Sequence, residues 1–350
     1  MRERRSIVEQ WQQGTAAALV TLVRVEGSSY RRPGARLLVS ADGSSIGSIS
    51  GGCLEAEVAR KARWGVRNGA VLERLSTVFD DTDDMPYGLG CGGTLDLLIE
   101  PVDTPEAAAL LSAMSESLTG LRRNVVTWLP TNGRSLRRAI YDESGTVIFE
   151  SSGSPSNLSV FDECLEPPQR LLLFGAGDDA QPISQLASLM GWQTFIFDGR
   201  PQLARRDRFH AAEAIFAASE FTTIVPQPDD AVVIMCHSYE QDRSWLNSIL
   251  PYQPRYIGLL GSRHRSSLLL SEAASTLRWT LDQACHNVFA PVGLDLGGDG
   301  AEAIALATIA EIQACRQGKL GHSRRMTPEI IAEQIARGGA ARYLQAQCAL

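Results

Sequence analysis

The sequence lacks any apolar run long enough to cross a membrane. Its longest such run, residues 16–23, is far shorter than the roughly 20 residues that a transmembrane helix needs. The first residues, MRERRSIVEQWQQG, are charged and lead into no apolar segment, so a signal peptide is not expected. We therefore predict a cytoplasmic protein that does not associate with membranes.

Cysteine is sparse and shows no pairing pattern. There is no C-x-x-C motif and no cysteine at metal-ligand spacing from a histidine, which argues against a disulfide framework and against a zinc site. Scattered cysteines of odd number are typical of a reducing compartment. The seven are Cys53, Cys91, Cys164, Cys236, Cys285, Cys315 and Cys348.

Basic residues are also fewer than acidic ones. Lys and Arg number 33 against 40 Asp and Glu, so the formal charge is −7, which argues against a nucleic-acid-binding protein with its basic face. The apolar share of 44% and the charged share of 21% are ordinary for globular proteins and exclude bulk disorder. A length of 350 residues predicts two or three domains.

Glycine is what the chain has in slight excess, and it is clustered. Fifteen of the 31 glycines fall into five groups. Glycine gathers where the backbone turns sharply or approaches a ligand closely, so the groups indicate either five turns or five ligand-contacting loops. The groups are Gly47/Gly51/Gly52, Gly88/Gly90/Gly92/Gly93, Gly175/Gly177, Gly258/Gly261 and Gly293/Gly297/Gly298/Gly300.

The first part of the chain alternates between strand and helix patterns, which predicts an N-terminal α/β domain over residues 1–125. Residues 126–167 follow as a short hairpin and a Ser/Pro-rich linker. The expected strands are 16–25, 35–40, 45–50, 71–78 and 94–102, the expected helices are 54–69 and 105–118, and the hairpin strands are 137–142 and 146–151.

Residues 168–320 show short apolar strands separated by helical stretches, a spacing that predicts a Rossmann-like, doubly wound parallel sheet. The fold class is therefore α/β in both domains. Residues 321–350 are expected to be a helical tail. The expected strands of the second domain are 171–174, 192–198, 215–216, 231–236 and 256–260, and its last helix is 301–316.

One turn in this domain has the spacing of a dinucleotide site. Gly175 and Gly177 follow a strand and open a helix, and Asp198 ends the next strand, where such sites place the acid that binds ribose. Asp178 and Asp179, however, lie on the first helical turn and would repel a pyrophosphate. NAD(P), another phosphate- or pterin-bearing ligand, and a purely structural turn all remain open, so an NAD(P)-dependent oxidoreductase is the alternative function.

Polar residues follow three strands of this sheet, and their carboxyl ends should meet in one crevice. Arg200 and Arg263 can pair with phosphate oxygens, as can Arg265, or can be solvated surface groups. His237 can donate to a ligand or make a structural hydrogen bond. Ser262 beside His237 indicates a hydrolase only weakly, because no G-x-S-x-G motif occurs.

Two cysteines lie among glycines. Cys53 begins a helix, whose N-terminus favours a thiolate. Cys91 lies between Gly90 and Gly92, in backbone that can wrap closely around a ligand. Each is interpreted either as a reactive or ligand-binding thiol or as a small residue that packs a tight turn.

Six segments in order along the chain resemble the XdhC/CoxI family of xanthine dehydrogenase accessory factors. The resemblance covers roughly residues 10–100 and 170–316, so it includes both expected domains. The segments are GSSYRRPGARLLVSADGSSIGSISGGCLEAEV, GLGCGGTLDLLIEP, LLLFGAGDDAQP, FDGRPQLARRDRF, YIGLLGSRHR and PVGLDLGGDGAEAIALATIAEI.

The resemblance implies a maturation factor rather than a catalyst. Such chaperones bind molybdenum cofactor, either molybdopterin or its cytosine dinucleotide form, and support its sulfuration by a cysteine desulfurase. They deliver it to a molybdenum hydroxylase of the xanthine dehydrogenase, aldehyde- or CO-oxidising type, and a cofactor nucleotidyltransferase and a homodimer are further partners that the resemblance allows. The family's glycine-flanked cysteine falls on Cys91, the expected molybdenum contact, and its first helix follows Cys53. Some members carry two cysteines in this loop, whereas this sequence has Cys91 alone.

Overall fold

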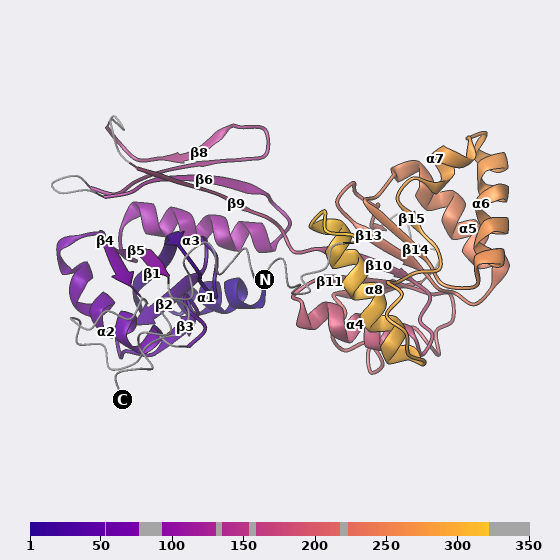
Figure 1. Ribbon diagram of the computed structural model, residues 1–350, viewed down its shortest axis with the longest axis horizontal. Helices are drawn as coiled ribbons and strands as arrows, with labels where there is room; N and C mark the ends of the chain where they lie inside the picture. The colour runs from indigo at the N-terminus through magenta and orange to yellow at the C-terminus, as the bar shows by residue number, and fades with distance from the viewer. Residues whose placement is uncertain (53, 77–92, 131–134, 154–158, 218–222, 322–350) are drawn as a thin grey trace, which may run out of the picture. The chain divides into compact units, whose positions relative to one another are not determined.

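The computed structural model describes residues 1–52, 54–76, 93–130, 135–153, 159–217 and 223–321. These residues form two compact units, 2–167 and 168–321, each of which is described by itself (Figure 1). Cys53, Gly90, Cys91 and Gly92 lie outside the described residues, as does the expected tail from residue 322 onward.

The N-terminal unit is built on an antiparallel five-stranded sheet. The turn at 42–44 is fixed by the Asp42 carboxylate, which accepts hydrogen bonds from the amide and hydroxyl of Ser44. The expected hairpin is therefore present, although the antiparallel pairing of the whole sheet did not follow from the alternation of strands and helices. The strand order is β3-β2-β1-β5-β4, formed by β1 (Ala16–Glu26), β2 (Arg36–Ser40), β3 (Ser45–Gly47), β4 (Val71–Ser76) and β5 (Thr94–Pro101).

Helices cover both faces of this sheet. α2 (Glu55–Gly65) packs on one face through Val58 and Ala62, while α1 (Arg2–Gln12) and α3 (Pro105–Leu118) belong to the core on the other face. Thr104 caps α3 by accepting a hydrogen bond from the Ala107 amide. The charged segment that opens the chain is thus a helix, which the sequence had not predicted.

A second antiparallel sheet lies over α3, so that α3 is sandwiched between two sheets (Figure 1). The expected hairpin is confirmed, but the expected linker is wrong at Val160–Leu165, which forms an edge strand because its backbone pairs with residues 123–128. The order is β8-β7-β6-β9, formed by β6 (Arg123–Trp128), β7 (Arg137–Tyr141), β8 (Val147–Glu150) and β9 (Val160–Leu165).

A buried ion pair joins the two sheets. The guanidinium of Arg138 on β7 donates to both carboxylate oxygens of Glu100 on β5, each at 3.0 Å. It also donates to the hydroxyl of Thr127 and to the carbonyl of Glu106. Both side chains are almost fully buried, so the charges are compensated by each other and by these hydrogen bonds rather than by water.

The C-terminal unit is a parallel six-stranded sheet, as predicted. Its order, β12-β11-β10-β13-β14-β15, is the doubly wound Rossmann order with the switch point between β10 and β13. α4 and α8 cover one face of the sheet and α5 and α6 cover the other. The strands are β10 (Arg170–Phe174), β11 (Gln193–Phe197), β12 (Ala214–Phe216), β13 (Ala231–Ile234), β14 (Tyr256–Leu259) and β15 (Val288–Phe289), and the helices are α4 (Ala180–Leu189), α5 (Tyr239–Ile249), α6 (Arg263–Leu277), α7 (Leu281–Cys285) and α8 (Ala301–Arg316).

Together the two units confirm the α/β fold class. Within the described residues, no helix combines the length and the apolar character that a membrane span requires.

Candidate functional site

The glycine turn after β10 is forced by close packing against β13. Gly175 has a φ of +121°, and a Cβ placed on it would overlap the carbonyl oxygen of Met235. Its amide donates to the carbonyl of Phe197 at the end of β11. Only glycine fits here, and the chain is thereby turned at the switch point of the sheet.

Asp198 closes this turn. One carboxylate oxygen accepts from the Ala176 amide at 2.7 Å, and Arg200 binds both oxygens through its side chain, at 2.9 and 2.7 Å. Burial raises the pKa of Asp198, but the hydrogen bonds from the Arg200 side chain and from the two backbone amides outweigh it, so the pKa lies below its usual value. Both oxygens of the predicted ribose-binding acid thus have partners within the protein.

The two acidic residues after Gly177 also have partners. Arg208 donates to Asp178 at 2.6 Å and to the carbonyl of Ala176 at 2.9 Å. Asp179 occupies the N-cap position of α4 without a side-chain capping bond and lies 3.4 Å from Nε2 of His237. The expected repulsion of an anion is therefore offset at Asp178 by the Arg208 cation, a residue that only the three-dimensional arrangement reveals.

His237 occupies the approach to the glycine turn. Its backbone is left-handed, with a φ of +62°, and its Nε2 lies 3.3 Å from where a Cβ on Gly177 would be. In dinucleotide sites the pyrophosphate approaches the second glycine of the motif. A dinucleotide in that pose would require the His237 ring, which is 54% exposed, to move away.

Of the residues that follow β14, Ser262 and Arg265 make contacts within the protein, whereas Arg263 is exposed to solvent. Ser262 caps α6 by accepting from the Arg265 amide, and the Arg265 guanidinium donates to buried Asp242 at 2.5 Å. Arg200 and Arg265, two of the predicted anion-binding arginines, are thus held by carboxylates. Arg263 is exposed on the first turn of α6.

Cys236, directly before His237, is buried. Its Sγ donates to the carbonyl of Phe174, and burial followed by nearby Asp242 raises the pKa of its thiol. Cys236 therefore stays protonated and serves the core.

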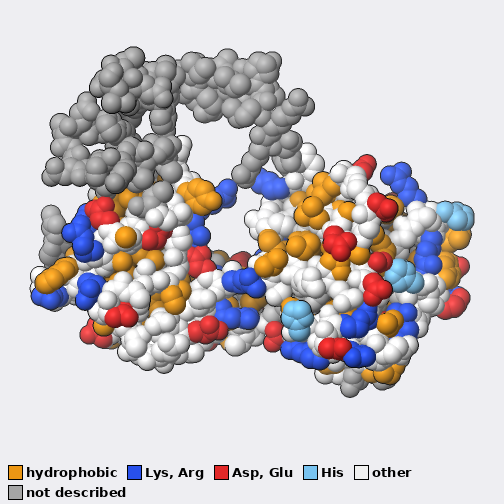
Figure 2. Space-filling view, turned by 90° about the horizontal axis from the view of Figure 1, so that it is seen from below, with side chains coloured by type: hydrophobic (Ala, Val, Ile, Leu, Met, Phe, Trp, Pro, Cys, Tyr) orange, Lys and Arg blue, Asp and Glu red, His pale blue; other side chains and the backbone are white. Residues whose placement is uncertain are grey.

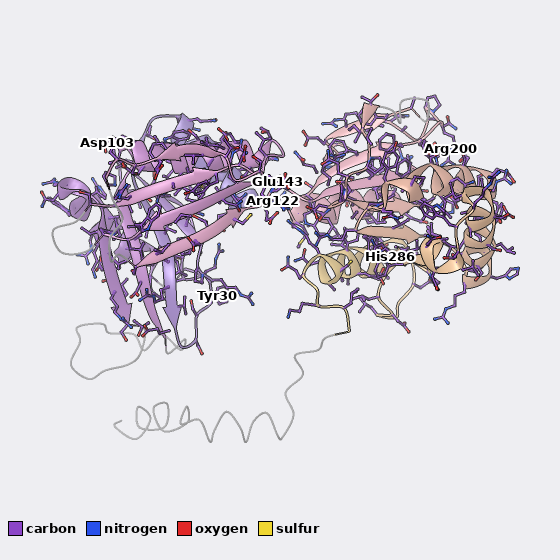
Figure 3. The ribbon with its side chains drawn as sticks, turned by 90° about the horizontal axis from the view of Figure 1, so that it is seen from above. Tyr30, Asp103, Arg122, Glu143, Arg200 and His286 are labelled. Carbon is purple, nitrogen blue, oxygen red and sulfur yellow. The ribbon has the colours of Figure 1, made fainter. Side chains whose placement is uncertain are left out.

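In the N-terminal unit, three segments meet at one end of the five-stranded sheet. The ring of Tyr30 lies on Gly51, within 2.6 Å of where its Cβ would be, and a Cβ on Gly93 would overlap the carbonyl of Ser28. Figure 3 shows Tyr30 at this end of the unit, and its side chain is 77% exposed. Two described glycines that are close in sequence to Cys53 and to Cys91 thus pack against the same loop.

A carboxylate organises the loop that precedes α2. Glu55 accepts hydrogen bonds from its surroundings at both oxygens, and these bonds lower its pKa to about 2 although its partial burial raises it. Glu3 on α1 supports the same region by accepting from the Ser48 amide and from Arg31. The donors to Glu55 are the hydroxyls of Ser48 and Ser50 and the amides of Ile49, Ser50, Gly51, Gly52 and Leu54.

Sequence reasoning did not identify Glu55 or Tyr30. A glutamate two residues after Cys53 looks like an ordinary first-turn acid of a helix, and its role depends on how the loop folds back. Within the described residues, no three His, Cys, Asp or Glu side chains are grouped so that they could hold a metal ion.

Comparison with known families matches both units. Residues 10–76 match the model described as the XdhC and CoxI family, and residues 171–312 match the XdhC Rossmann domain.

Individual proteins are similar over nearly the full length. A probable xanthine dehydrogenase subunit of Bacillus subtilis is 30% identical over 86% of this chain and 93% of its own. The molybdenum cofactor insertion chaperone PaoD of Escherichia coli is 28% identical over 89% and 87%. A crystal structure of a xanthine dehydrogenase from Bacillus halodurans superposes with a TM-score of 0.78 at 28% identity and covers 94% of this chain and 99% of that one. With two matched domains and a relative that is 30% identical over 86% of the sequence, this chain belongs to the XdhC and CoxI family.

Proposed function

We propose that this protein is a molybdenum cofactor insertion chaperone for a xanthine dehydrogenase-type molybdenum hydroxylase. The observation that carries the proposal is similarity over about nine-tenths of the chain to a protein named as such a chaperone, together with a relative named for xanthine dehydrogenase. The cofactor is cargo in this proposal: the protein holds it, supports its sulfuration by a cysteine desulfurase and releases it to the hydroxylase.

The N-terminal unit supplies the thiols. Cys91, flanked by Gly90 and Gly92, contacts the molybdenum or its sulfido group, and Cys53 lies in the second loop. A thiolate suits this role because it is a soft ligand for a metal and an acceptor for transferable sulfur. The packing of Gly51 and Gly93 against residues 28–30 supports the proposal, since these two glycines are each two residues from one of the cysteines in sequence.

The C-terminal unit recognises the phosphate-bearing end of the cofactor, in the molybdopterin or cytosine dinucleotide form. In this unit Arg263 is the main cation for the phosphate. It is exposed after the end of β14 and has no ion pair among the described residues, unlike Arg200 and Arg265. The neighbouring turns complete the proposed set, which comprises Gly175, Gly177, Asp198, Arg200, His237 and Ser262.

Loss of cofactor on removal of one thiol tests the proposal. The full chain is purified from cells that make molybdenum cofactor, and bound molybdenum and the fluorescence of the oxidised pterin are measured for the wild type, for Cys91→Ala and for Cys285→Ala. Cys285 is an exposed free thiol in the C-terminal unit and serves as the control. We expect Cys91→Ala alone to lose molybdenum and hydroxylase activation; equal retention in all three proteins refutes the role of Cys91.

Titration with NADH tests the alternative oxidoreductase. Asp198 is held by Ala176 and Arg200, and His237 lies over Gly177, so no saturable binding at micromolar concentrations is expected. Saturable binding of NADH would favour the oxidoreductase.

A further inference from the structure

An exposed face of α2 carries three arginines and a tryptophan. Arg60, Arg63, Trp64 and Arg67 are spaced so that they share one side of α2 and of the 3₁₀ turn Val66–Asn68 that continues it. All four are exposed, while the opposite side of the helix is buried against the sheet. We call these four residues the arginine–tryptophan face.

The arginines of this face form no salt bridge within the part of the chain that the structure describes. Lys61, their neighbour, is paired with Glu57 and Glu73, and these two carboxylates are thereby engaged. Asp42 is close enough to Arg63 for the guanidinium charge to lower its pKa slightly, but its carboxylate is bound to Ser44. Many other arginines of the unit are paired with an acid, as Arg74 is with Glu26.

Trp64 is in contact with one of these arginines, Arg67. The guanidinium carbon of Arg67 lies 4.2 Å from the centre of the Trp64 ring, a cation–π contact that restrains both side chains. Trp64 nevertheless remains 64% exposed. Basic and hydrophobic side chains lie next to one another at the left end of the N-terminal unit in Figure 2, the side on which α2 lies in Figure 1.

We infer that the arginine–tryptophan face docks an acidic surface of the molybdenum hydroxylase. Arginine and tryptophan are among the residues most enriched where binding energy concentrates at protein interfaces, and three guanidinium groups without a salt bridge on a chain of net charge −7 select an acidic partner. A partner seated here lies along the C-terminal half of α2, the helix that follows the Glu55-organised loop. This inference rests on the proposed function, since the partner is the enzyme that receives the cofactor.

A protein fits this face better than a nucleic acid or a membrane. Nucleic-acid binding draws on many phosphate contacts from an extended basic surface, whereas this face offers three arginines on a chain of net charge −7. A membrane-surface helix needs a broad apolar face, and here the apolar residues of α2 are buried in the core.

The test measures binding of the full-length chain to the cofactor-free xanthine dehydrogenase-type hydroxylase of the same cell. The triple variant Arg60→Glu/Arg63→Glu/Arg67→Glu should weaken binding by about tenfold or more at about 50 mM salt, and by much less at about 500 mM. Trp64→Ala should weaken it about fivefold at either salt concentration. Arg2→Glu/Arg5→Glu, which reverses two exposed arginines on α1, is the control and should stay within about twofold of the wild type. Circular dichroism confirms that each variant is folded.

The outcomes separate this inference from the proposed function. If the wild type retains molybdenum cofactor and the triple variant binds the hydroxylase as tightly as the wild type, docking on α2 is wrong and the chaperone proposal stands. If the wild type binds neither cofactor nor hydroxylase, both fail. Binding of a single-stranded RNA of about 20 nucleotides or of anionic lipid vesicles that the triple variant loses, with hydroxylase binding unchanged, also overturns the inference.

Discussion

Replacement of Glu55 by Gln should loosen the loop before α2 without unfolding the N-terminal unit. The carboxylate accepts from the amides of Ile49, Gly51 and Gly52 among its donors. A glutamine offers one acceptor oxygen and turns its amide hydrogens toward the other donors. Some buried N–H groups would then lose their partner, and the loop would have to rearrange.

The size of the effect follows from the pKa. Burial raises the pKa of Glu55, but hydrogen bonds from the Ser50 side chain and backbone and from Ser48 bring it from 4.5 down to about 2, which sets a ceiling of about 3 kcal/mol at neutral pH. Because the side chain is only partly buried, solvent screening reduces this to roughly 1–2 kcal/mol. Since the folded-state pKa lies below the unfolded value, the stabilisation is complete above about pH 4.5 and is lost as the pH falls toward 2.

The assay combines urea unfolding with hydrogen exchange, and Glu57→Gln is the control because Glu57 lies on the same helix and pairs with Lys61 rather than with the loop. We expect Glu55→Gln to lose roughly 1–2 kcal/mol of the free energy of unfolding at pH 7, and nothing near pH 2. Protection of the amides at residues 49–52 should fall in this variant and persist in the control. Unchanged protection of these amides in Glu55→Gln would refute the assignment of the loop to this carboxylate.

Three further predictions, on Gly175, on Arg138 and on Cys164, test the structure. Gly175→Ala should cost about 2–4 kcal/mol in urea unfolding, since its Cβ would overlap backbone at a positive φ, whereas Gly177→Ala meets only a side chain and should cost less than about 1 kcal/mol; equal costs would contradict this account. Arg138→Met should cost about 3–5 kcal/mol by leaving a buried carboxylate unpaired, and a near-neutral result would show that the pair is solvated. Burial and then Glu166 raise the pKa of Cys164 to about 11, so alkylation at pH 8 should be slow although the residue is exposed, and Glu166→Gln should speed it about threefold; an unchanged rate would exclude the carboxylate as a cause.

The parallel sheet could be predicted because its strands are short apolar runs that end at glycine turns. The second antiparallel sheet could not be predicted fully. The exposure of Val160–Leu165 alternates, but Glu163 lies on the inward side, where it pairs with Arg36. The sequence therefore shows no apolar alternation there, and a Ser/Pro-rich stretch precedes it. α1 was missed for a similar reason, since only Ile7 and Val8 of its 11 residues are buried. Elements that bury one or two side chains leave little pattern in a sequence.

The glycine turn shows the same limit at a site. The spacing predicted a glycine turn and an acid at the end of the next strand, and Asp198 indeed lies at this turn, where it accepts from the Ala176 amide. What the acid does there depends on Arg200 and on the left-handed backbone of His237, which places a ring over Gly177. The spacing of a glycine motif predicts the path of the backbone. It does not predict the side chains that line the ligand-facing side of the turn, because these come from other strands of the sheet.

The backbone of the loop before α2 bears on the proposed contact between the N-terminal unit and molybdenum cofactor. Gly51 and Gly52 both have positive φ, and a Cβ on Gly52 would meet no atom within 4 Å, so glycine is needed there for backbone direction rather than for space. That direction turns the Gly52 amide to Glu55, at 2.8 Å. A loop with exposed glycine amides is commonly a cradle for phosphate, but here a carboxylate of the same chain already holds those amides. The amides of residues 49–52 and 54 are therefore held by Glu55 and are not available to an anionic ligand unless this carboxylate moves away.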